Sequence, residues 1–465
     1  MTTLRLSAAE FRALAESVTT LATDFLAGLD NRQTVSATSA TDTAAFDLPV
    51  PEQGVGEAVL RDLEAIAEHV RAPTGRRLPY VVGSGDPIGA LADFYASLLN
   101  QNVTAWRSAP AAVAIEQTVL GWVAEAIGCA RFAGTFTSGG SLGNLMALAM
   151  ARESRAPANE DGAQPGVVYA SEEVHMSIPK GVAMLGLGRA NLRLIAVDEN
   201  MRIDVPVLES AIVRDHEAGL HGIALIGSAG TIMTGAIDPL ADLADVARRH
   251  DLWFHVDGAY GAPAALAAPE KFIGLSDADS ISLDAHKWLY QPLDCSLLLY
   301  RDADAARRTF AYSAEYVKTT SEDPTEAFAF FDQTIELSRR FRALKLWLSI
   351  RYHGLAAFRA AIAENLAQAK LLAELIDAEP SLELLAPVEL SAVCFRWSNG
   401  DLDRLNGSNE AVLRAVNQAG RVWLSNASVR GTIGLRACIT NHRTTDLDVR
   451  AIVDEVLSAA DLVTE

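Results

Sequence analysis

The stretch Leu283-Asp284-Ala285-His286-Lys287-Trp288 follows an apolar run that is typical of a buried strand. A second strand-like segment, His255-Val256-Asp257-Gly258-Ala259-Tyr260, carries a carboxylate near its end, and Lys287 lies 30 residues after Asp257. A lysine amine condenses with an aldehyde. An aspartate beside a pyridine nitrogen keeps that nitrogen protonated, so that the ring can accept electrons. Lys287 and Asp257 together therefore predict a binding site for pyridoxal 5′-phosphate (PLP).

Strand-like runs alternate with helical stretches across residues 131–300. The runs are Arg131–Phe136, Val167–Ala170, Leu192–Val197, Ile223–Gly227, Trp253–Val256, Ser280–Leu283 and Ser296–Tyr300. This alternation predicts an α/β fold with a mainly parallel sheet covered by helices on both faces. Ligands of such sheets bind beyond the carboxyl ends of the strands. We therefore expect Asp257 and Lys287 to open into one crevice.

Two further regions flank this pattern. Residues Ser7–Glu10 read as a capping box, and apolar residues then repeat at helical spacing over Phe11–Leu29, ahead of a second helix near residues 55–70. A helix over residues 336–352 leads into a final region with mixed helical and strand patterns. We expect an N-terminal helical arm (1–86), a large α/β domain (87–352) and a small C-terminal α+β domain (353–465). The apolar stripe of the arm needs a covering surface, and a second subunit is one candidate.

The composition favours an ordinary globular protein of the cytoplasm. Acidic residues outnumber basic ones, 59 to 39, which argues against nucleic acid or an anionic membrane as a partner. The four cysteines (Cys129, Cys295, Cys394 and Cys438) are far apart and form no CxxC motif, as is typical of reduced thiols. The first residues lack a basic segment before an apolar core, and no apolar run is long enough to cross a bilayer.

A glycine-containing turn after the first strand is a candidate phosphate site. The segment Thr137-Ser138-Gly139-Gly140-Ser141 opens a helix, and a helix start offers free N–H groups and a positive dipole to an anion. The segment lacks the Gly-Lys-Ser/Thr ending of a P-loop. The alternative is an ordinary strand-to-helix turn. The predicted PLP lysine favours the phosphate interpretation.

Two more residues follow strand ends and could face the cofactor. His175 could lie flat on an aromatic ring, and Thr231 could hydrogen-bond to cofactor or substrate. Each could equally be a structural loop residue. A metal site formed by His255, Asp257 and His286 would leave Lys287 without a role and has no third ligand at short helical spacing, so we expect no metal.

With these residues assembled, the chain resembles the group II PLP-dependent amino-acid decarboxylases, the family of aromatic-L-amino-acid, histidine and glutamate decarboxylases. The likeness extends from Ala9–Arg12 in the arm through the segments quoted above to Arg339–Lys345 and Leu435–Ile439. The resemblance implies PLP-dependent transferase fold type I and a homodimer whose N-terminal helices pack on the partner. It also implies decarboxylation of an L-amino acid, possibly aromatic, to the amine and CO₂.

The resemblance also assigns roles to individual residues. Lys287 would form the internal aldimine, and Asp257 would support the quinonoid that follows loss of CO₂ by pairing with the pyridine nitrogen. The other implied cofactor contacts are His175 and Ala259 on the two ring faces, Gly139, Gly140 and Ser141 at the phosphate, and Thr231 and His286. The residues implied on the substrate side are Tyr80, Val81, Trp106 and Phe330.

Some positions depart from the family pattern. Asp284 stands where asparagine often helps to bind phosphate, and its carboxylate should repel that anion unless it points away. Val81 replaces an aromatic residue after Tyr80. Asn102 and Thr104 stand where apolar and aromatic side chains would reach in from the partner. These changes predict a smaller and more polar substrate pocket.

Phe330 aligns with the tyrosine that protonates the carbon left by CO₂ in the decarboxylases. Phenylalanine cannot donate a proton, and relatives with phenylalanine there include aldehyde synthases, which consume oxygen and release an aldehyde. Alternatively, Phe330 is a packed loop residue and another group supplies the proton. Two further hypotheses are a catalytically silent PLP-binding protein and another fold-type-I reaction such as desulfuration.

Overall fold

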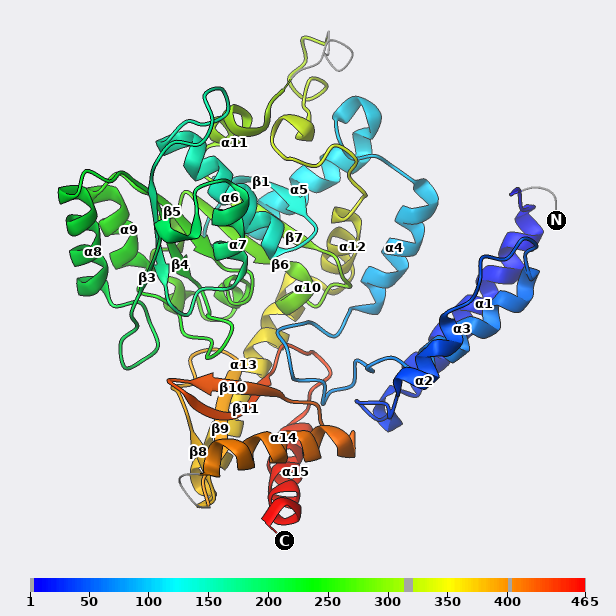
Figure 1. Ribbon diagram of the computed structural model, residues 1–465. Coiled ribbons are helices and arrows are strands. Elements are labelled where there is room, and N and C mark those ends of the chain that lie inside the picture. Colours follow the sequence, from blue (N-terminus) through cyan, green and yellow to red (C-terminus); the bar gives the residue numbers. More distant parts are fainter. Residues whose placement is uncertain (1–3, 313–320, 400–403, 465) are drawn as a thin grey trace.

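The computed structural model describes residues 4–312, 321–399 and 404–464 of the 465-residue chain. Figure 1 shows a large sheet wrapped by helices, a smaller sheet with its own helices near the C-terminus, and a helical arm that projects to one side. Among the residues in these ranges, no helix has the length and apolar character needed to span a membrane.

The large sheet contains all seven predicted strands. They are β1 (Ala133–Thr137), β2 (Val167–Ser171), β3 (Leu192–Ile195), β4 (Gly222–Ser228), β5 (Trp253–Asp257), β6 (Ser280–Asp284) and β7 (Ser296–Tyr300), in the order β1-β7-β6-β5-β4-β2-β3. The pairs from β3 to β6 are parallel, which confirms the expected architecture, whereas β7 runs antiparallel to both of its neighbours. The apolar run of β7 is buried at every residue. A strand sequence in which apolar and polar residues do not alternate predicts that the strand is buried, but not whether it runs parallel or antiparallel to its neighbours.

Helices cover both faces of this sheet. They are α4 (Pro87–Leu99), α5 (Pro110–Ala126), α6 (Gly140–Arg155), α7 (Ser177–Met184), α8 (Val205–Glu217), α9 (Leu240–Arg249), α10 (Ala285–Trp288), α11 (Ala303–Phe310) and α12 (Ala343–His353). Alternate strand residues enter different cores: Leu298 belongs to the core that includes residues of α6, α7 and α11, whereas Leu297 belongs to the core that includes residues of α5, α8 and α9. This alternation follows from the two-residue period of a strand.

The helix predicted over residues 336–352 begins later than expected, at Ala343. The preceding segment is held by Arg339, whose buried guanidinium donates to Val103 O at 2.6 Å and to Thr135 Oγ1 at 2.8 Å and forms an ion pair with Glu116. A helical backbone from residue 336 would have to give up these contacts. Tertiary interactions therefore override the helical pattern of the sequence there.

The C-terminal region forms the expected α+β unit. Its sheet contains β8 (Leu382–Leu384), β9 (Ala392–Trp397), β10 (Ser425–Val429) and β11 (Thr432–Cys438), antiparallel in the order β10-β11-β9-β8. Its helices are α13 (Leu355–Ala378), α14 (Leu405–Ala419) and α15 (Asp446–Thr464). A separate apolar core joins the sheet to these helices, with Phe395 and Leu435 at its centre.

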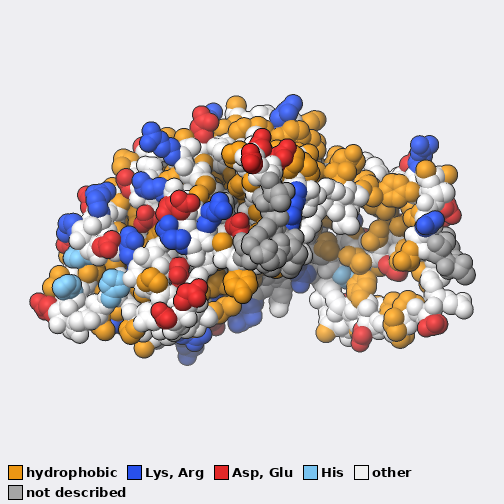
Figure 2. Space-filling model, turned by 90° about the horizontal axis from the view of Figure 1, so that it is seen from above, with side chains coloured by type: hydrophobic (Ala, Val, Ile, Leu, Met, Phe, Trp, Pro, Cys, Tyr) orange, Lys and Arg blue, Asp and Glu red, His pale blue; other side chains and the backbone are white. Residues whose placement is uncertain are grey.

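The arm consists of α1 (Ala8–Ala27), the short α2 (Ala40–Thr43) and α3 (Leu60–Glu68). The predicted capping box is present, because Ser7 Oγ accepts from the Glu10 N–H and the Glu10 carboxylate accepts from the Ser7 N–H. The second predicted helix is shorter than expected, since residues 56–59 form a 3-10 turn before α3. Neither α1 nor α3 contains a buried residue. Apolar side chains such as Phe11 and Ile66 are therefore left exposed, as Figure 2 shows for the projecting arm.

Candidate active site

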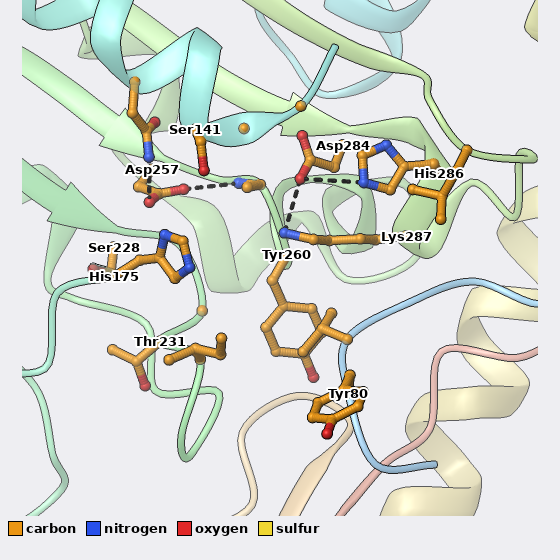
Figure 3. Close-up of a pocket in the computed structure, with 18 of the residues that line it drawn as sticks. Tyr80, Ser141, His175, Ser228, Thr231, Asp257, Tyr260, Asp284, His286 and Lys287 are labelled. Carbon is orange, nitrogen blue, oxygen red and sulfur yellow. Dashed lines mark hydrogen bonds and ion pairs between the residues drawn. The ribbon is translucent and has the colours of Figure 1, made fainter. Parts of the chain in front are cut away.

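A cavity of about 300 Å³ opens beyond the carboxyl ends of β4, β5 and β6 (Figure 3). Of the residues predicted from the sequence, the structure brings together Tyr80, Val81, Gly139, Gly140, Ser141, His175, Thr231, Asp257, Ala259, His286 and Lys287 around this cavity. Lys287 and Asp257, the two residues from which the cofactor was inferred, reach it from different strand ends. The loops that follow parallel strands all lie at the carboxyl edge of the sheet, which explains why segments so far apart in the chain meet there.

Asp257 ends β5 and is held in one orientation by three donors. Its Oδ2 accepts from Asn144 Nδ2 at 2.8 Å, and its Oδ1 accepts from Ser282 Oγ and from the Ala259 N–H, each at 3.2 Å. The side chain is buried. A carboxylate held in one orientation in this way can stabilise a positive charge that lies beside it.

Lys287 lies in α10, the single helical turn that follows β6. Its amine is 2.8 Å from Oδ2 of Asp284, and its side chain is 22% exposed, which leaves the amine accessible from the cavity. Burial alone would raise the pKa of Asp284, but the charges of Lys287 and His286 outweigh burial and lower that pKa below its ordinary value. The unexpected aspartate thus points toward the lysine as its counter-ion.

The predicted phosphate cradle is the start of α6. No side chain caps this helix, so its first N–H groups remain available to an anion. A Cβ on Gly140 would come within 2.9 Å of the Ala259 Cβ and 3.0 Å of Asp284 Oδ2, whereas a Cβ on Gly139 would meet nothing within 4 Å. Glycine at position 140 is therefore required for the start of α6 to lie so close to the ends of β5 and β6. The space next to Gly139 is empty.

His175 lies in the loop between β2 and α7, as predicted. Its Nδ1 is 2.8 Å from Ser177 Oγ. Burial is the main reason that the pKa of His175 is lowered, and the nearby charge of Lys287 acts in the same direction. The imidazole is therefore neutral at pH 7. Thr231, on the turn after β4, is also buried, and its hydroxyl lies 3.1 Å from that of Thr234.

Trp106 and Phe330 do not line the cavity. Trp106 begins a 3-10 turn (Trp106–Ser108), and its N–H donates to Phe328 O at 3.0 Å. Phe330 is fully buried, with the guanidinium carbon of Arg339 4.3 Å from its ring centroid. Asn102 and Thr104 line a separate hollow of about 810 Å³. Residues 313–320, which precede Phe330 in the chain, lie outside the described residues.

Sequence reasoning missed three polar residues that hold the site together, namely Asn144, Ser177 and Ser282. Asn144 lies on α6 four residues after Gly140, so both face the same side of the helix. A buried amide within the apolar run of α6 was the available signal, since a buried polar group needs partners.

The histidines that a metal site would have used have other partners. His255 Nε2 is 3.0 Å from Asn144 Oδ1, and His286 Nδ1 is 3.1 Å from Cys295 O. Within the described parts of the chain, no three His, Cys, Asp or Glu side chains are grouped closely enough to hold a metal ion.

The residues around the cavity fit PLP. The cavity offers an accessible amine, a fixed carboxylate, an uncapped helix start kept open by glycine, and a neutral imidazole, and its volume suits a small aromatic ligand. A fixed carboxylate at the end of one strand and a lysine beyond the next one define a PLP-dependent enzyme of fold type I.

Comparisons with known proteins identify the family. Residues 17–398 match the pyridoxal-dependent decarboxylase conserved domain. The chain is 34% identical to an aromatic-L-amino-acid decarboxylase of Bacillus atrophaeus, covering 99% of this chain and 97% of that protein. It is 32% identical to a phenylacetaldehyde synthase of Arabidopsis thaliana over 72% of this chain and 71% of the other. The chain belongs to the pyridoxal-dependent decarboxylase family.

A solved structure agrees with this assignment. The tryptophan decarboxylase of Catharanthus roseus, crystallised with L-tryptophan, superposes with a TM-score of 0.90 at 25% identity, covering 99% of this chain and all of the other. The cofactor of this enzyme is PLP, and its reaction is the decarboxylation of an amino acid. A catalytically silent PLP-binding protein and a desulfurase are thereby set aside.

Proposed function

We propose that this enzyme acts on an aromatic L-amino acid and releases the corresponding amine and CO₂. The observation that carries the proposal is the meeting of Lys287 and Asp257 in one cavity. The choice of an aromatic substrate is supported by the apolar side of that cavity, which Tyr80, Val81, Ile232 and Leu293 provide. It is also supported by the relatives, which include decarboxylases of tyrosine and tryptophan.

The chemistry is divided between cofactor and protein. When bound, PLP supplies an aldehyde that links to amines and a ring that accepts the electrons left by CO₂. Lys287 supplies the amine to which the cofactor attaches. Asp257, whose carboxylate is fixed by Asn144 and Ser282, would lie beside the ring nitrogen and hold a proton there.

We assign the remaining residues to the cofactor by their place around the cavity. Gly139, Gly140 and Ser141 form the anion site at the start of α6. His175 and Ala259 flank the ring, while Thr231 and His286 complete the wall.

Phe330 is best explained as a packing residue. Its ring is covered by the Arg339 guanidinium and by the edge of Phe328, at 4.8 Å between ring centroids. Because the Phe330 side chain is fully buried, in that position it touches no ligand in the cavity of its own subunit or of a partner. It therefore gives no reason to expect an aldehyde. Because the relatives include a phenylacetaldehyde synthase, the product analysis below also measures aldehyde.

We further propose a cytoplasmic homodimer built from the arm (1–86), the large domain (87–352) and the small domain (353–465). The apolar faces of α1 and of α4, with exposed Phe11, Leu91 and Phe94, are the surfaces that a second subunit would cover. Trp106 would then serve the partner's cavity. Sedimentation of the full chain and of a chain lacking the arm tests the dimer: a full chain that sediments as a monomer overturns it.

The experiment that tests the activity is product analysis of the PLP-loaded enzyme with each common amino acid. CO₂, amine, aldehyde, ammonia and oxygen uptake are measured in parallel. Amine and CO₂ in equal amounts from tyrosine, tryptophan, phenylalanine or DOPA support the proposal. Aldehyde with oxygen uptake, or turnover of only acidic or aliphatic amino acids, contradicts it.

A further inference from the structure

Asn144 is the branching point of a buried hydrogen-bond network beneath the cavity. Its Nδ2 lies 2.8 Å from Asp257 Oδ2 and 2.8 Å from Ser177 Oγ, and its Oδ1 lies 3.0 Å from His255 Nε2. Asn144 is 1% exposed, and its partner His255 is fully buried. Buried polar groups of this kind need hydrogen-bond partners, and these contacts provide them.

The network extends at both ends. Beyond Ser177, Oγ lies 2.8 Å from His175 Nδ1. Beyond His255, Nδ1 lies 2.9 Å from Ser280 Oγ, which accepts from Trp253 Nε1 at 2.9 Å. A continuous series of hydrogen bonds thus connects the indole of Trp253, at the start of β5, with the imidazole of His175 on the cavity wall.

The donor and the acceptor in each of these hydrogen bonds follow from the groups that can only donate or only accept. An ionised Asp257 only accepts, so the amide of Asn144 must turn its NH₂ toward Asp257 and Ser177. Ser177 Oγ accepts one of these hydrogens, and its own proton is then free to be donated to His175 Nδ1. The backbone N–H of Ser177 points to the same nitrogen at 3.3 Å. Nδ1 of His175 is therefore an acceptor.

The other branch agrees with this direction. Since Asn144 Oδ1 accepts, His255 must donate from Nε2, and its Nδ1 accepts from the Ser280 hydroxyl. Nδ1 is also 3.1 Å from Ser280 O, which a proton on Nδ1 would satisfy. That tautomer would set Nε2 and Asn144 Oδ1 against each other as two acceptors at 3.0 Å, so the Nε2–H form is favoured. Burial lowers the pKa of His255 to about 4, and it therefore carries a single proton.

We propose that Asn144 is a positioning residue that sets two cofactor-facing groups at once: it fixes the carboxylate of Asp257 and, through Ser177, holds neutral His175 in the tautomer with its proton on Nε2. His175 then presents a hydrogen-bond donor to the cavity and no base. A donor at that place suits an anionic oxygen, such as the α-carboxylate of the amino-acid substrate. Only this last step rests on the proposed function.

The tautomer is measurable without cofactor or activity. In apoprotein labelled with ¹⁵N-histidine, long-range proton–nitrogen correlations report which ring nitrogen carries the proton, and His175→Gln identifies the signal. The wild-type protein should show His175 protonated on Nε2. A wild-type signal with the proton on Nδ1 overturns the proposal, whatever the substrate proves to be.

Variants test the route through Asn144 and Ser177. Ser177→Ala and Asn144→Ala should change the His175 nitrogen shifts toward a mixture of tautomers, and Ser177→Thr, which keeps the hydroxyl, should restore them. Asn144→Ala should in addition weaken PLP binding by about tenfold, because Asp257 loses a charge-assisted hydrogen bond. Ser177→Ala, which removes no contact of Asp257, should weaken PLP binding less than Asn144→Ala does.

Ser349→Ala is the matched control. Ser349 is another buried serine, and its hydroxyl donates to the carboxylate of Asp86 at 2.5 Å, away from this network. It should lower stability without moving the His175 signals. Unchanged His175 signals in Ser177→Ala, or equal shifts in the control, count against the network. If Asn144→Ala fails to fold, the Ser177 series still decides.

Discussion

Oδ2 of Asp284 lies 2.8 Å from the amine of Lys287, and the aspartate side chain is only 3% exposed. The same oxygen packs against the first turn of α6, where a Cβ on Gly140 would lie 3.0 Å from it. One ionised carboxylate thus neutralises the lysine and stands beside the helix start that favours anions. This arrangement explains how an aspartate is tolerated where the sequence suggested repulsion of the cofactor phosphate.

Replacing Asp284 with asparagine should speed the capture of PLP by the apoenzyme severalfold at pH 7. The ion pair must break before the amine can attack the cofactor aldehyde, and the carboxylate opposes the approach of a phosphate. Stopped-flow absorbance after mixing apoenzyme with PLP measures the rate. Asp294→Asn is the control, because Asp294 also has a lowered pKa but pairs with Arg342. A capture rate equal to that of the wild type would mean that the pair does not control access.

Lys287→Ala should abolish the visible absorbance that PLP keeps after dialysis. Among the residues that line the cavity, no other amine lies beside both Asp257 and the start of α6. Lys180→Ala is the matched control, since Lys180 lies nearby on α7 but is exposed. Retention of the absorbance by Lys287→Ala would assign the cofactor link to another residue.

Asp257→Asn should lower kcat by a factor on the order of several thousand while the protein stays folded. Asparagine keeps the shape of the side chain but removes the charge that stabilises a protonated ring nitrogen, a loss of several kcal/mol in the barrier. Steady-state kinetics and circular dichroism measure the two effects. A loss of less than about tenfold would show that another carboxylate faces the ring.

Acid should destabilise the protein in a defined pH range. Burial lowers the pKa of His255 from 6.5 to about 4, so between these values the unfolded chain binds a proton that the folded protein does not. The free energy of unfolding is therefore undiminished above about pH 6.5 and falls as the pH drops toward 4, by roughly 3 kcal/mol from this residue. His442 adds to the loss in the same range.

Urea unfolding at several pH values measures this dependence. His255→Gln should reduce the fall in the free energy of unfolding between pH 6.5 and 4, because glutamine can still donate to Asn144 but binds no proton. His216→Gln, at the exposed end of α8, serves as control and should keep the wild-type slope. If the free energy of unfolding of His255→Gln fell with pH as steeply as that of the wild type, other groups would be responsible.

The sequence contained enough information to find Lys287 and Asp257, because a strand run fixes where each side chain emerges and parallel strands end at one edge. It did not contain the partners of Asp257. Asn144 reaches Asp257 only after α6 packs on the sheet, and Ser177 reaches Asn144 only after α7 packs beside α6. No local pattern encodes these contacts. The same reason explains the late start of α12, since the contacts of Arg339 with Val103 and Thr135 join distant segments.

Phe330 provides the sharpest test of what residue-by-residue alignment can transfer. Its ring is completely buried between Arg339 and Phe328. Phe330→Tyr must place a hydroxyl in that packed space, and we expect a loss of about 1–3 kcal/mol in stability with amine as the product before and after the change. Phe328→Tyr, at the half-buried neighbour, should cost less and also leave the product unchanged. If the wild type instead released aldehyde and Phe330→Tyr released amine, Phe330 would have to reach the reacting carbon, and the packing explanation would be wrong.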